Sequence, residues 1–86
     1  MHELFEFNES AFKHGFTRAD AINAFDNFMF KGPMIKEDRG KNLIIGFSTN
    51  LEIIEVIYQI EVSGTNRIFH IMECKKYYLD RYLGGK

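Results

Sequence analysis

The sequence predicts a single α+β domain over residues 1–86, with helices packed on one side of an antiparallel sheet of three to four strands. Three observations predict this fold class. The chain has only 86 residues, which is too few for two separate hydrophobic cores. Its hydrophobic share of 45% is sufficient for one core. The spacing of apolar residues changes from helical to alternating after residue 41, and it returns to helical near the end.

The first elements that we expect are a strand, a helical turn and the start of a helix. Residues 4–7 alternate weakly and meet a cluster of capping residues, which predicts a strand followed by a turn that closes at residues 14–15. Thr17 and Asp20 match a capping box, because each side chain can bond to the backbone N–H of the other. A helix should therefore begin after Thr17.

This helix is predicted to be amphipathic and about three turns long. Its apolar residues recur at helical spacing and are Ile22, Phe25, Phe28 and Met29. The polar residues expected on its opposite, solvated face are Asp20, Asn23 and Asn27. Lys31-Gly32-Pro33 should end the helix, and residues 34–40 should form a polar connection that is compatible with an edge strand.

The middle of the chain predicts three strands in an antiparallel meander. Residues 43–48 are apolar on both faces, as is typical of an inner strand, and residues 51–62 alternate. The predicted buried face of this second strand carries Ile54, Val56, Tyr58, Ile60 and Val62. Its other face is amphipathic and carries Leu51, Ile53, Glu55, Ile57, Gln59 and Glu61. Residues 63–66 predict a hairpin to a third strand over 67–73, and a short helix should follow over 75–83.

Composition restricts the class of function. The chain has 11 basic and 12 acidic side chains, so overall charge does not favour nucleic-acid binding. Residues 65–86 nevertheless hold five basic and two acidic groups. This excess of basic groups is compatible with a surface that faces an anion and with solvated helix ends. The one cysteine, Cys74, excludes an intramolecular disulfide, and a reducing cytoplasm fits best. No apolar run approaches the ~20 residues of a membrane span, so we expect a cytoplasmic protein without membrane contact.

Motif-defined enzyme classes have no support in this sequence. It contains no phosphate-binding glycine loop, no H-E-x-x-H pair, no EF-hand loop and no G-x-S-x-G elbow. Its histidines, cysteine and carboxylates lack the spacing of metal ligands. We therefore expect neither a cofactor nor a metal.

Two groups of residues are candidates for chemistry by position. Lys13 and His14 lie at the end of the first helical turn, where they could cap the helix or meet an anion. On the third predicted strand, His70 falls in an apolar row opposite Arg67 and Glu73, provided that the strand is regular. A hydrogen-bonded core histidine and a catalytic one are both compatible with that row.

The end of the third strand and the last helix offer further candidates. Glu73 and Lys75 lie where side chains can leave the core and meet a substrate. Lys75, Lys76 and Arg81 could bind phosphate. The tyrosines, Tyr78 among them, could stack on a base or could seal the helix against the sheet.

The order of several short motifs resembles a known family. These motifs are Phe5-Glu6-Phe7-Asn8, Lys13-His14-Gly15-Phe16-Thr17, Asp38-Arg39, Ile44-Ile45-Gly46, Glu55-Val56-Ile57-Tyr58, Arg67-Ile68, His70 to Lys76 and Tyr82. Over nearly the whole chain they resemble the BrnT-type toxins of type II toxin–antitoxin systems. A related group of small proteins without an established function shares the K-H-G start and the ending around His70 to Lys75.

The resemblance implies a compact RelE-like fold and a ribonuclease that arrests translation. It also implies an antitoxin protein that neutralises the toxin, with RNA as substrate and a homo- or hetero-oligomer as the assembly. The chain departs from the family pattern at Lys75, which replaces an arginine, and at Glu73, which replaces a serine.

If the chain is a metal-independent endoribonuclease, each candidate residue can be assigned a role in the cleavage of RNA. Glu73 or His14 would act as base, and His70 or Tyr78 would assist the leaving group. Lys13, Arg67 and Lys75 would stabilise the phosphate. Lys76, Tyr78 and Arg81 would bind RNA. The alternative is a non-catalytic protein-interaction module with a degenerate toxin fold, which would use an exposed sheet edge or apolar patch.

Overall fold

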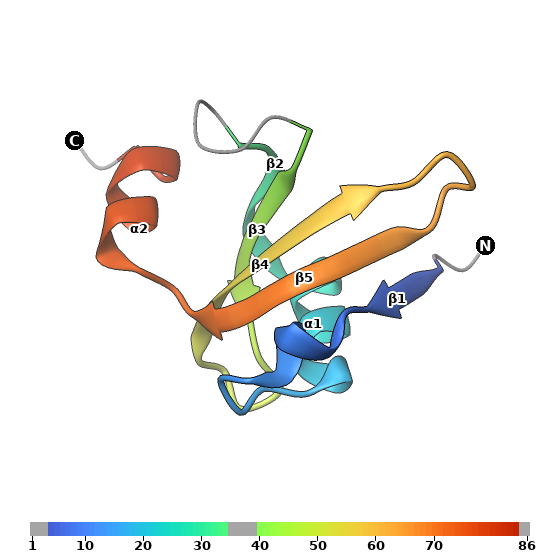
Figure 1. The fold of residues 1–86 in the computed structure, drawn as a ribbon. Coiled ribbons are helices and arrows are strands. Elements are labelled where there is room, and N and C mark those ends of the chain that lie inside the picture. The colour runs from blue at the N-terminus through green and yellow to red at the C-terminus, as the bar shows by residue number, and fades with distance from the viewer. Residues whose placement is uncertain (1–3, 35–39, 85–86) are drawn as a thin grey trace.

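In the computed structural model, which describes residues 4–34 and 40–84, the strands form one sheet accompanied by helices (Figure 1). The α+β class of the sequence prediction is confirmed. The elements are β1 (Phe5–Phe7), the 3-10 helix η1 (Glu9–Phe12), α1 (Arg18–Asp26), β2 (Phe28–Pro33), β3 (Asn42–Phe47), β4 (Ile53–Ile60), β5 (Asn66–Glu73) and α2 (Lys76–Tyr82). The five described strands follow the order β1-β5-β4-β3-β2.

The sheet is mixed, so the prediction of an antiparallel sheet with three to four strands is wrong. Strands β2 to β5 form an antiparallel meander, which includes the three predicted strands. Strand β1 pairs in parallel with β5, with Phe5 opposite Asn66 and Phe7 opposite Ile68. By lying there, β1 covers an edge of β5 that would otherwise expose unpaired backbone groups.

The helices pack on opposite faces of the sheet, not on one side as predicted. On β3, Ile44 belongs to a core cluster with Ala21, Ala24 and Phe25 of α1. Its neighbours Leu43 and Ile45 belong to a second cluster with residues of α2. Because successive side chains of a strand point to opposite faces, α1 covers one face and α2 the other.

Helix α1 begins where the sequence predicts and ends earlier. The capping box is present, with Thr17 Oγ1 accepting from the Asp20 N–H at 3.2 Å and Asp20 accepting from the Thr17 N–H at 2.9 Å. The helix stops at Asp26, because Asn27 leaves the helical dihedral region. Phe28 and Met29, which we expected on its buried face, are exposed on strand β2. Residues 31–33, the expected helix stop, also belong to β2.

The expected solvated face of α1 is instead a contact with the β3–β4 turn. Asp20 is buried, and its carboxylate accepts hydrogen bonds from the Thr49 N–H and hydroxyl at 2.9 and 2.8 Å. Asn23 donates to the carbonyl of Phe47 at 2.8 Å. Burial raises the pKa of Asp20, but the hydrogen bonds from Thr49 and Thr17 outweigh it and lower the pKa below 3.8.

Close approach of α1 to β3 depends on Gly46. A Cβ atom at this position would lie 2.7 Å from the carbonyl oxygen of Asn27 and 2.9 Å from that of Ala24. Both are backbone atoms and cannot rotate away. The glycine therefore sets how closely the end of α1 lies on the sheet.

The hairpin of β4 and β5 extends beyond the part of the sheet that α1 covers (Figure 1). Ile54, Val56 and Tyr58 of β4 are buried as predicted. Ile60 and Val62 were also expected inside, but they are exposed. The prediction fails there because alternation sets the face of a side chain and not whether another layer covers it.

The connection between β2 and β3 is described only in part. Met34 is buried, and its N–H donates to the carbonyl of Lys41 at 3.0 Å. The edge strand β2 ends at Pro33, before the segment of residues 34–40 in which we expected one, and Met34 is not part of a strand. Residues 35–39, with the Asp38-Arg39 motif, lie outside the described residues. None of the described helices is long and apolar enough to cross a membrane.

Candidate functional site

A carboxylate with no exposed surface lies in the middle of the sheet, on the α2 face. Glu55 of β4 is 0% exposed. Its Oε2 atom lies 2.8 Å from Nε2 of His70, and its Oε1 accepts a hydrogen bond from the Lys75 N–H at 2.9 Å. The ammonium of Lys75 lies 3.6 Å from Oε2. A buried carboxylate is costly unless such partners surround it, and these contacts supply them.

His70 faces Glu55 because β5 contains a bulge. Tyr58 pairs with Ile68, whereas the adjacent Ile57 pairs with His70, so Phe69 is an extra residue on β5. The bulge brings His70 to the same face of the sheet as Arg67, and the expectation that they lie on opposite faces is wrong. Glu73 lies on the face opposite His70, as predicted, since it pairs with Ile54.

His14 lies next to His70, although 56 positions separate them in the sequence. Their ring centroids are 5.6 Å apart, and the ring planes meet at 73°. The turn that carries His14 follows η1, which packs beside β5 and donates a hydrogen bond from the Ser10 hydroxyl to the Phe69 carbonyl at 3.4 Å. We call His14, Glu55, His70 and Lys75 the histidine cluster.

The histidine cluster leaves specific atoms available for chemistry. Nε2 of His70 and Oε2 of Glu55 share a hydrogen bond, and the arrangement relevant to catalysis is the one in which Nε2 is the donor. In a neutral imidazole the other nitrogen, Nδ1, is then an acceptor. The side chain of His70 is 23% exposed, and His14 is exposed. A substrate can therefore reach both rings, while Glu55 is reached only through His70 and Lys75.

Two of the lysines that we predicted to bind phosphate are close in sequence to the histidines. Lys13 directly precedes His14, and Lys75 follows His70 by five residues. Lys75 is the N-cap residue of α2, and its ammonium also lies over the ring of Tyr78, 4.9 Å from the centroid. Lys13 is the C-cap residue of η1, is exposed and precedes His14 directly. Its backbone N–H bonds to Ser10, as expected of a cap.

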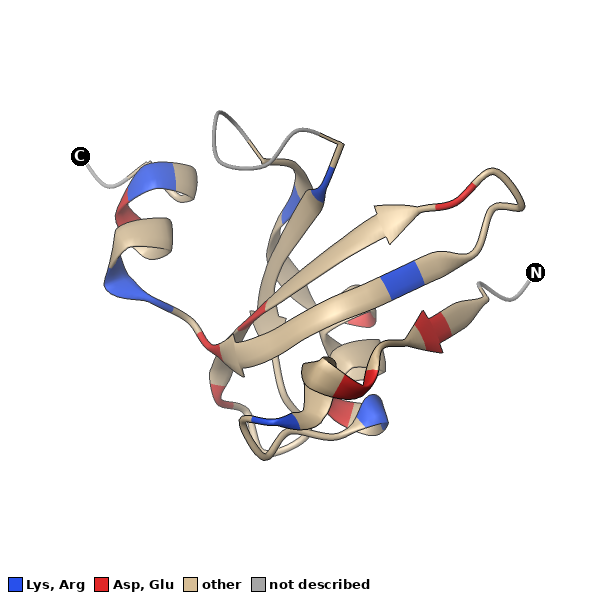
Figure 2. Ribbon diagram, viewed as in Figure 1, with Lys and Arg blue, Asp and Glu red and all other residues tan. Residues whose placement is uncertain are grey.

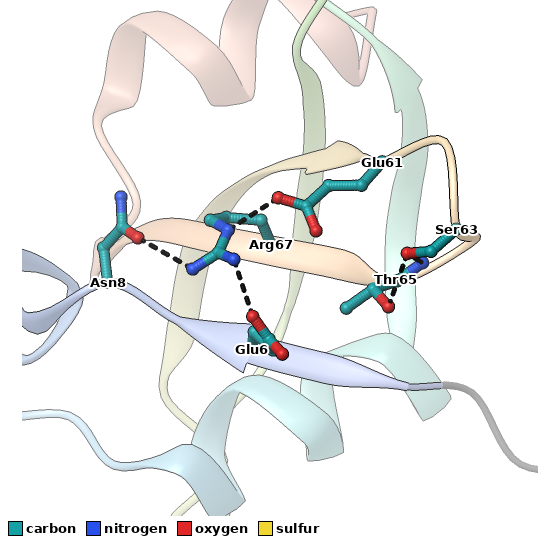
Figure 3. A network of polar contacts seen from close by, with 6 residues as sticks. All are labelled: Glu6, Asn8, Glu61, Ser63, Thr65 and Arg67. Atoms are coloured by element: carbon teal, nitrogen blue, oxygen red, sulfur yellow. Dashed lines mark hydrogen bonds and ion pairs between the residues drawn. The ribbon is translucent and has the colours of Figure 1, made fainter.

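Arg67 does not belong to the histidine cluster. Its guanidinium donates to Glu61 at 2.8 Å, to Glu6 at 2.6 Å and to Asn8 at 3.3 Å (Figure 3). The hydrogen bond to Glu61, followed by the charges of both glutamates, raises the pKa of Arg67 above its ordinary value. These contacts join β1 to β5 and to the end of β4, which is a structural task.

Glu73 lines a pocket rather than facing the two imidazoles. The pocket has a volume of about 350 Å³. Its walls are formed by the end of β5, the start of β4, the turn after η1 and one residue of α2, namely Phe16, Glu52, Ile53, Glu73, Cys74 and Leu79. We call this the end pocket. Glu73 is thus poorly placed to act as the base that the sequence proposed.

The three residues of α2 that we predicted to bind RNA, Lys76, Tyr78 and Arg81, each have different contacts. Basic positions mark both ends of this helix (Figure 2). Lys76 forms an ion pair with Asp80 at 3.1 Å, and the guanidinium of Arg81 lies 5.9 Å from the ring centroid of Tyr77. Tyr78 is 7% exposed and packs in the core beneath α2, so its ring seals the helix against the sheet.

Cys74 is a half-buried thiol that lines the end pocket and directly precedes Lys75 of the histidine cluster. Its Sγ atom donates to the carbonyl of Lys75 at 3.6 Å. Burial, and then the negative charge of Glu55, raise its pKa from 9.0 to about 12, while Lys75 acts in the opposite direction. Cys74 is therefore a thiol and not a thiolate at neutral pH.

Glu55 is the residue of this site that the sequence-based assignment missed. A signal was present, because Glu55 is an acidic residue within a strand of mainly apolar side chains. We expected its face to be amphipathic, and a glutamate there is ordinary when that face meets water. Packing of α2 on the same face is what buries it.

The described residues contain no group of three or more histidine, cysteine, aspartate or glutamate side chains that could hold a metal ion. Comparisons of the chain with protein-family models, curated proteins and solved structures found no match.

Proposed function

We propose that this chain is a metal-independent endoribonuclease of the toxin–antitoxin kind, with the histidine cluster as its catalytic centre. The carrying observation is the pair of imidazoles of His14 and His70, with ring centroids 5.6 Å apart. Cleavage of RNA by its own 2′-OH needs a base for that hydroxyl and an acid for the departing 5′-oxygen. Imidazole serves in both roles near neutral pH.

In this proposal the two histidines have different roles. His70 is the base, because its Nε2 is bonded to Glu55 and its Nδ1 can accept the 2′-OH proton. The 2′-oxygen attacks phosphorus, the bond to the 5′-oxygen breaks, and His14 gives that oxygen a proton. The products are a 2′,3′-cyclic phosphate and a 5′-OH end. Glu55 acts as a positioning residue, since it touches His70 and not the substrate.

The negative charge that develops on phosphorus requires cations. Lys75 provides one, since its side chain is 48% exposed and lies beside the imidazole of His70 through their shared contact with Glu55. Lys13 provides another next to His14. Arg67, Glu73 and Tyr78 leave the catalytic set, because their contacts or burial keep them away from the two rings.

The decisive experiment measures cleavage of a labelled single-stranded RNA in EDTA. We expect cleavage that leaves a 2′,3′-cyclic phosphate, and a loss of about 10²–10⁴-fold in His14→Ala. His14 is exposed, so this variant should fold normally. Lys31→Ala, which removes a cation on β2, is the matched control and should retain activity. Equal cleavage by wild type and His14→Ala would contradict the proposal.

The biological part of the proposal has its own test. A RelE-like toxin should arrest growth when expressed, and a partner antitoxin should restore growth. His14→Ala should relieve the arrest while still binding that antitoxin. If both proteins arrest growth equally, the histidine cluster is not the source of toxicity.

A second candidate function is a protein-interaction module without catalysis. It is favoured by Phe28 and Met29, which are 47% and 40% exposed on the edge strand β2. Exposed apolar side chains on a sheet edge are typical of surfaces that bind another chain. This function would predict binding that Phe28→Ser weakens, with no RNA cleavage by the wild type.

A further inference from the structure

We infer that the end pocket binds a guanine base of the RNA, next to the phosphate at the histidine cluster, and that Glu73 recognises it. This inference rests on the proposed ribonuclease function and adds a base preference to it. No part of the catalytic proposal requires the pocket, so the two can be tested separately.

The size and walls of the end pocket suit a flat heterocycle. Its volume of about 350 Å³ lies at the lower end of the range for small-molecule sites, ~300–1,000 Å³. Phe16 supplies an aromatic wall, and Ile53 and Leu79 supply apolar ones. Unpaired bases are commonly held by stacking on aromatic side chains, with hydrogen bonds to their edges.

The polar side chains of the end pocket offer acceptors to a ligand. Neither Glu52 nor Glu73 has a side-chain hydrogen bond or ion pair with the described part of the chain, so both carboxylates can accept from a ligand. The Cys74 thiol already donates to the Lys75 carbonyl. A matching ligand must therefore present hydrogen-bond donors, as the N–H groups on the edge of a base do. A phosphate would be repelled here, which leaves it to the lysines of the histidine cluster.

Guanine is the RNA base that meets this requirement. Its Watson–Crick edge carries two adjacent donors, N1–H and the 2-amino group, which one carboxylate can accept together. Adenine and cytosine each pair a donor with an acceptor on that edge. Uracil has one donor between two acceptors. One carboxylate therefore accepts from both donors of guanine, whose O6 acceptor stays outside the contact, whereas each other base offers a single donor group on that edge.

Glu73 is the better placed of the two carboxylates. It is the last residue of β5 and pairs with Ile54 in the sheet, whereas Glu52 lies in the turn before β4, next to Leu51 with a φ of 68°. Side chains on rigid elements recognise ligands more sharply than those on turns.

The end pocket and the histidine cluster share two chain segments. Phe16 follows His14 by two residues in the same turn, and Glu73 and Cys74 come directly before Lys75. Our inference places a base in the pocket and the adjoining phosphate at the rings, around the end of β5, because Glu73 lies on the face opposite His70.

Binding of free nucleosides tests the pocket without any catalysis. We would titrate 15N-labelled protein with guanosine, inosine, adenosine, cytidine and uridine and follow the backbone amide signals. Guanosine should shift the signals of Phe16, Ile53 and Cys74 and bind at least about tenfold more tightly than adenosine, cytidine or uridine. Inosine lacks the 2-amino group and should bind more weakly than guanosine.

Two substitutions make the test specific. Glu73→Gln should abolish the preference for guanosine, because an amide presents one acceptor and one donor. Glu9→Gln is the matched control on η1, outside the pocket, and should keep the preference. Equal binding of all nucleosides, no binding of guanosine, or loss of the preference in Glu52→Gln alone would overturn the assignment to Glu73.

Cleavage of RNAs that differ in one base separates this inference from the proposed function. If guanosine binds and no RNA is cleaved, the pocket assignment stands and the ribonuclease proposal fails. If RNA is cleaved without a preference for guanosine next to the cut, the ribonuclease stands and the pocket assignment fails.

Discussion

Glu55 and His70 face each other diagonally across β4 and β5, with Oε2 and Nε2 2.8 Å apart. Neither is the direct cross-strand partner of the other, since Glu55 pairs with Met72 and His70 with Ile57. Their contact exists because the bulge at Phe69 advances β5 by one residue. The same carboxylate accepts a hydrogen bond from the backbone N–H of Lys75, the N-cap residue of α2. One buried side chain thus links two strands and the last helix.

Removal of this carboxylate should destabilise the protein strongly. Glu55→Ala leaves His70 and the Lys75 N–H without their acceptor and empties a fully buried site, so its loss should be about 2–5 kcal/mol. Glu55→Gln keeps the volume and one acceptor, so its loss should be about 1–3 kcal/mol. Urea unfolding followed by circular dichroism measures both. Glu9→Gln should stay within about 0.5 kcal/mol of wild type. A loss below about 1 kcal/mol in Glu55→Ala would contradict the buried contact.

The carboxylate of Asp20 should make stability depend on pH in the acid range. Its folded pKa is lowered from 3.8, so the unfolded chain binds the proton first as the pH falls. The stability that it contributes is therefore complete above pH 3.8 and is lost as the pH falls through the lower folded value. Asp20→Asn should lower the free energy of unfolding by about 1 kcal/mol at neutral pH, and the difference from wild type should shrink in acid. A difference that does not change with pH would argue against ionised Asp20 as the cap.

Substitution of Gly46 should separate α1 from the sheet. Gly46→Ala places a methyl group within 3 Å of two backbone oxygens, which cannot give way. We expect a loss of about 1–3 kcal/mol in the free energy of unfolding. Gly32→Ala on β2 is the control, because its nearest neighbour would be the movable ring of Phe30 at 3.3 Å. If both variants lose equal stability, close packing of α1 is not the reason.

Cys74 should be unreactive in the folded protein. With its pKa raised from 9.0 to about 12, its thiolate fraction at pH 8 is about 10³-fold lower than that of a thiol with the ordinary value. Reaction with a chromogenic disulfide should be slow in buffer and fast in denaturant. The raised pKa also means that stability contributed by the protonated thiol is lost as the pH rises from 9.0 towards 12. Equal rates in buffer and denaturant would contradict this burial.

Local signals were sufficient for the start of α1, because the capping box of Thr17 and Asp20 acts over three residues. They were insufficient for its end. Phe28 and Met29 follow Phe25 at helical spacing, and the same apolar run is compatible with a strand. Asn27 leaves the helical region, and the edge of β3 then provides backbone partners for β2. That choice depends on tertiary pairing.

The histidine cluster was predicted in part. His14, His70 and Lys75 were recognised by type and position, but their proximity depends on a bulge and on η1 packing beside β5. Neither the bulge nor this packing can be predicted from the spacing of apolar residues in the sequence. Glu55 is a buried partner of His70 and Lys75 because α2 covers its face of the sheet. Glu73 lies on the opposite face because side chains alternate again after the bulge.

The parallel pairing of β1 with β5 has a consequence for synthesis of the chain. Phe5 of β1 pairs with Asn66 of β5, so β1 can enter the sheet only after β5 has been synthesised. Until β5 has been made, β1 has no strand to pair with. Contacts so distant in sequence form slowly, because a long loop must close first. The proposed His14–His70 pair would therefore form only after β5 has been synthesised and has paired with β1.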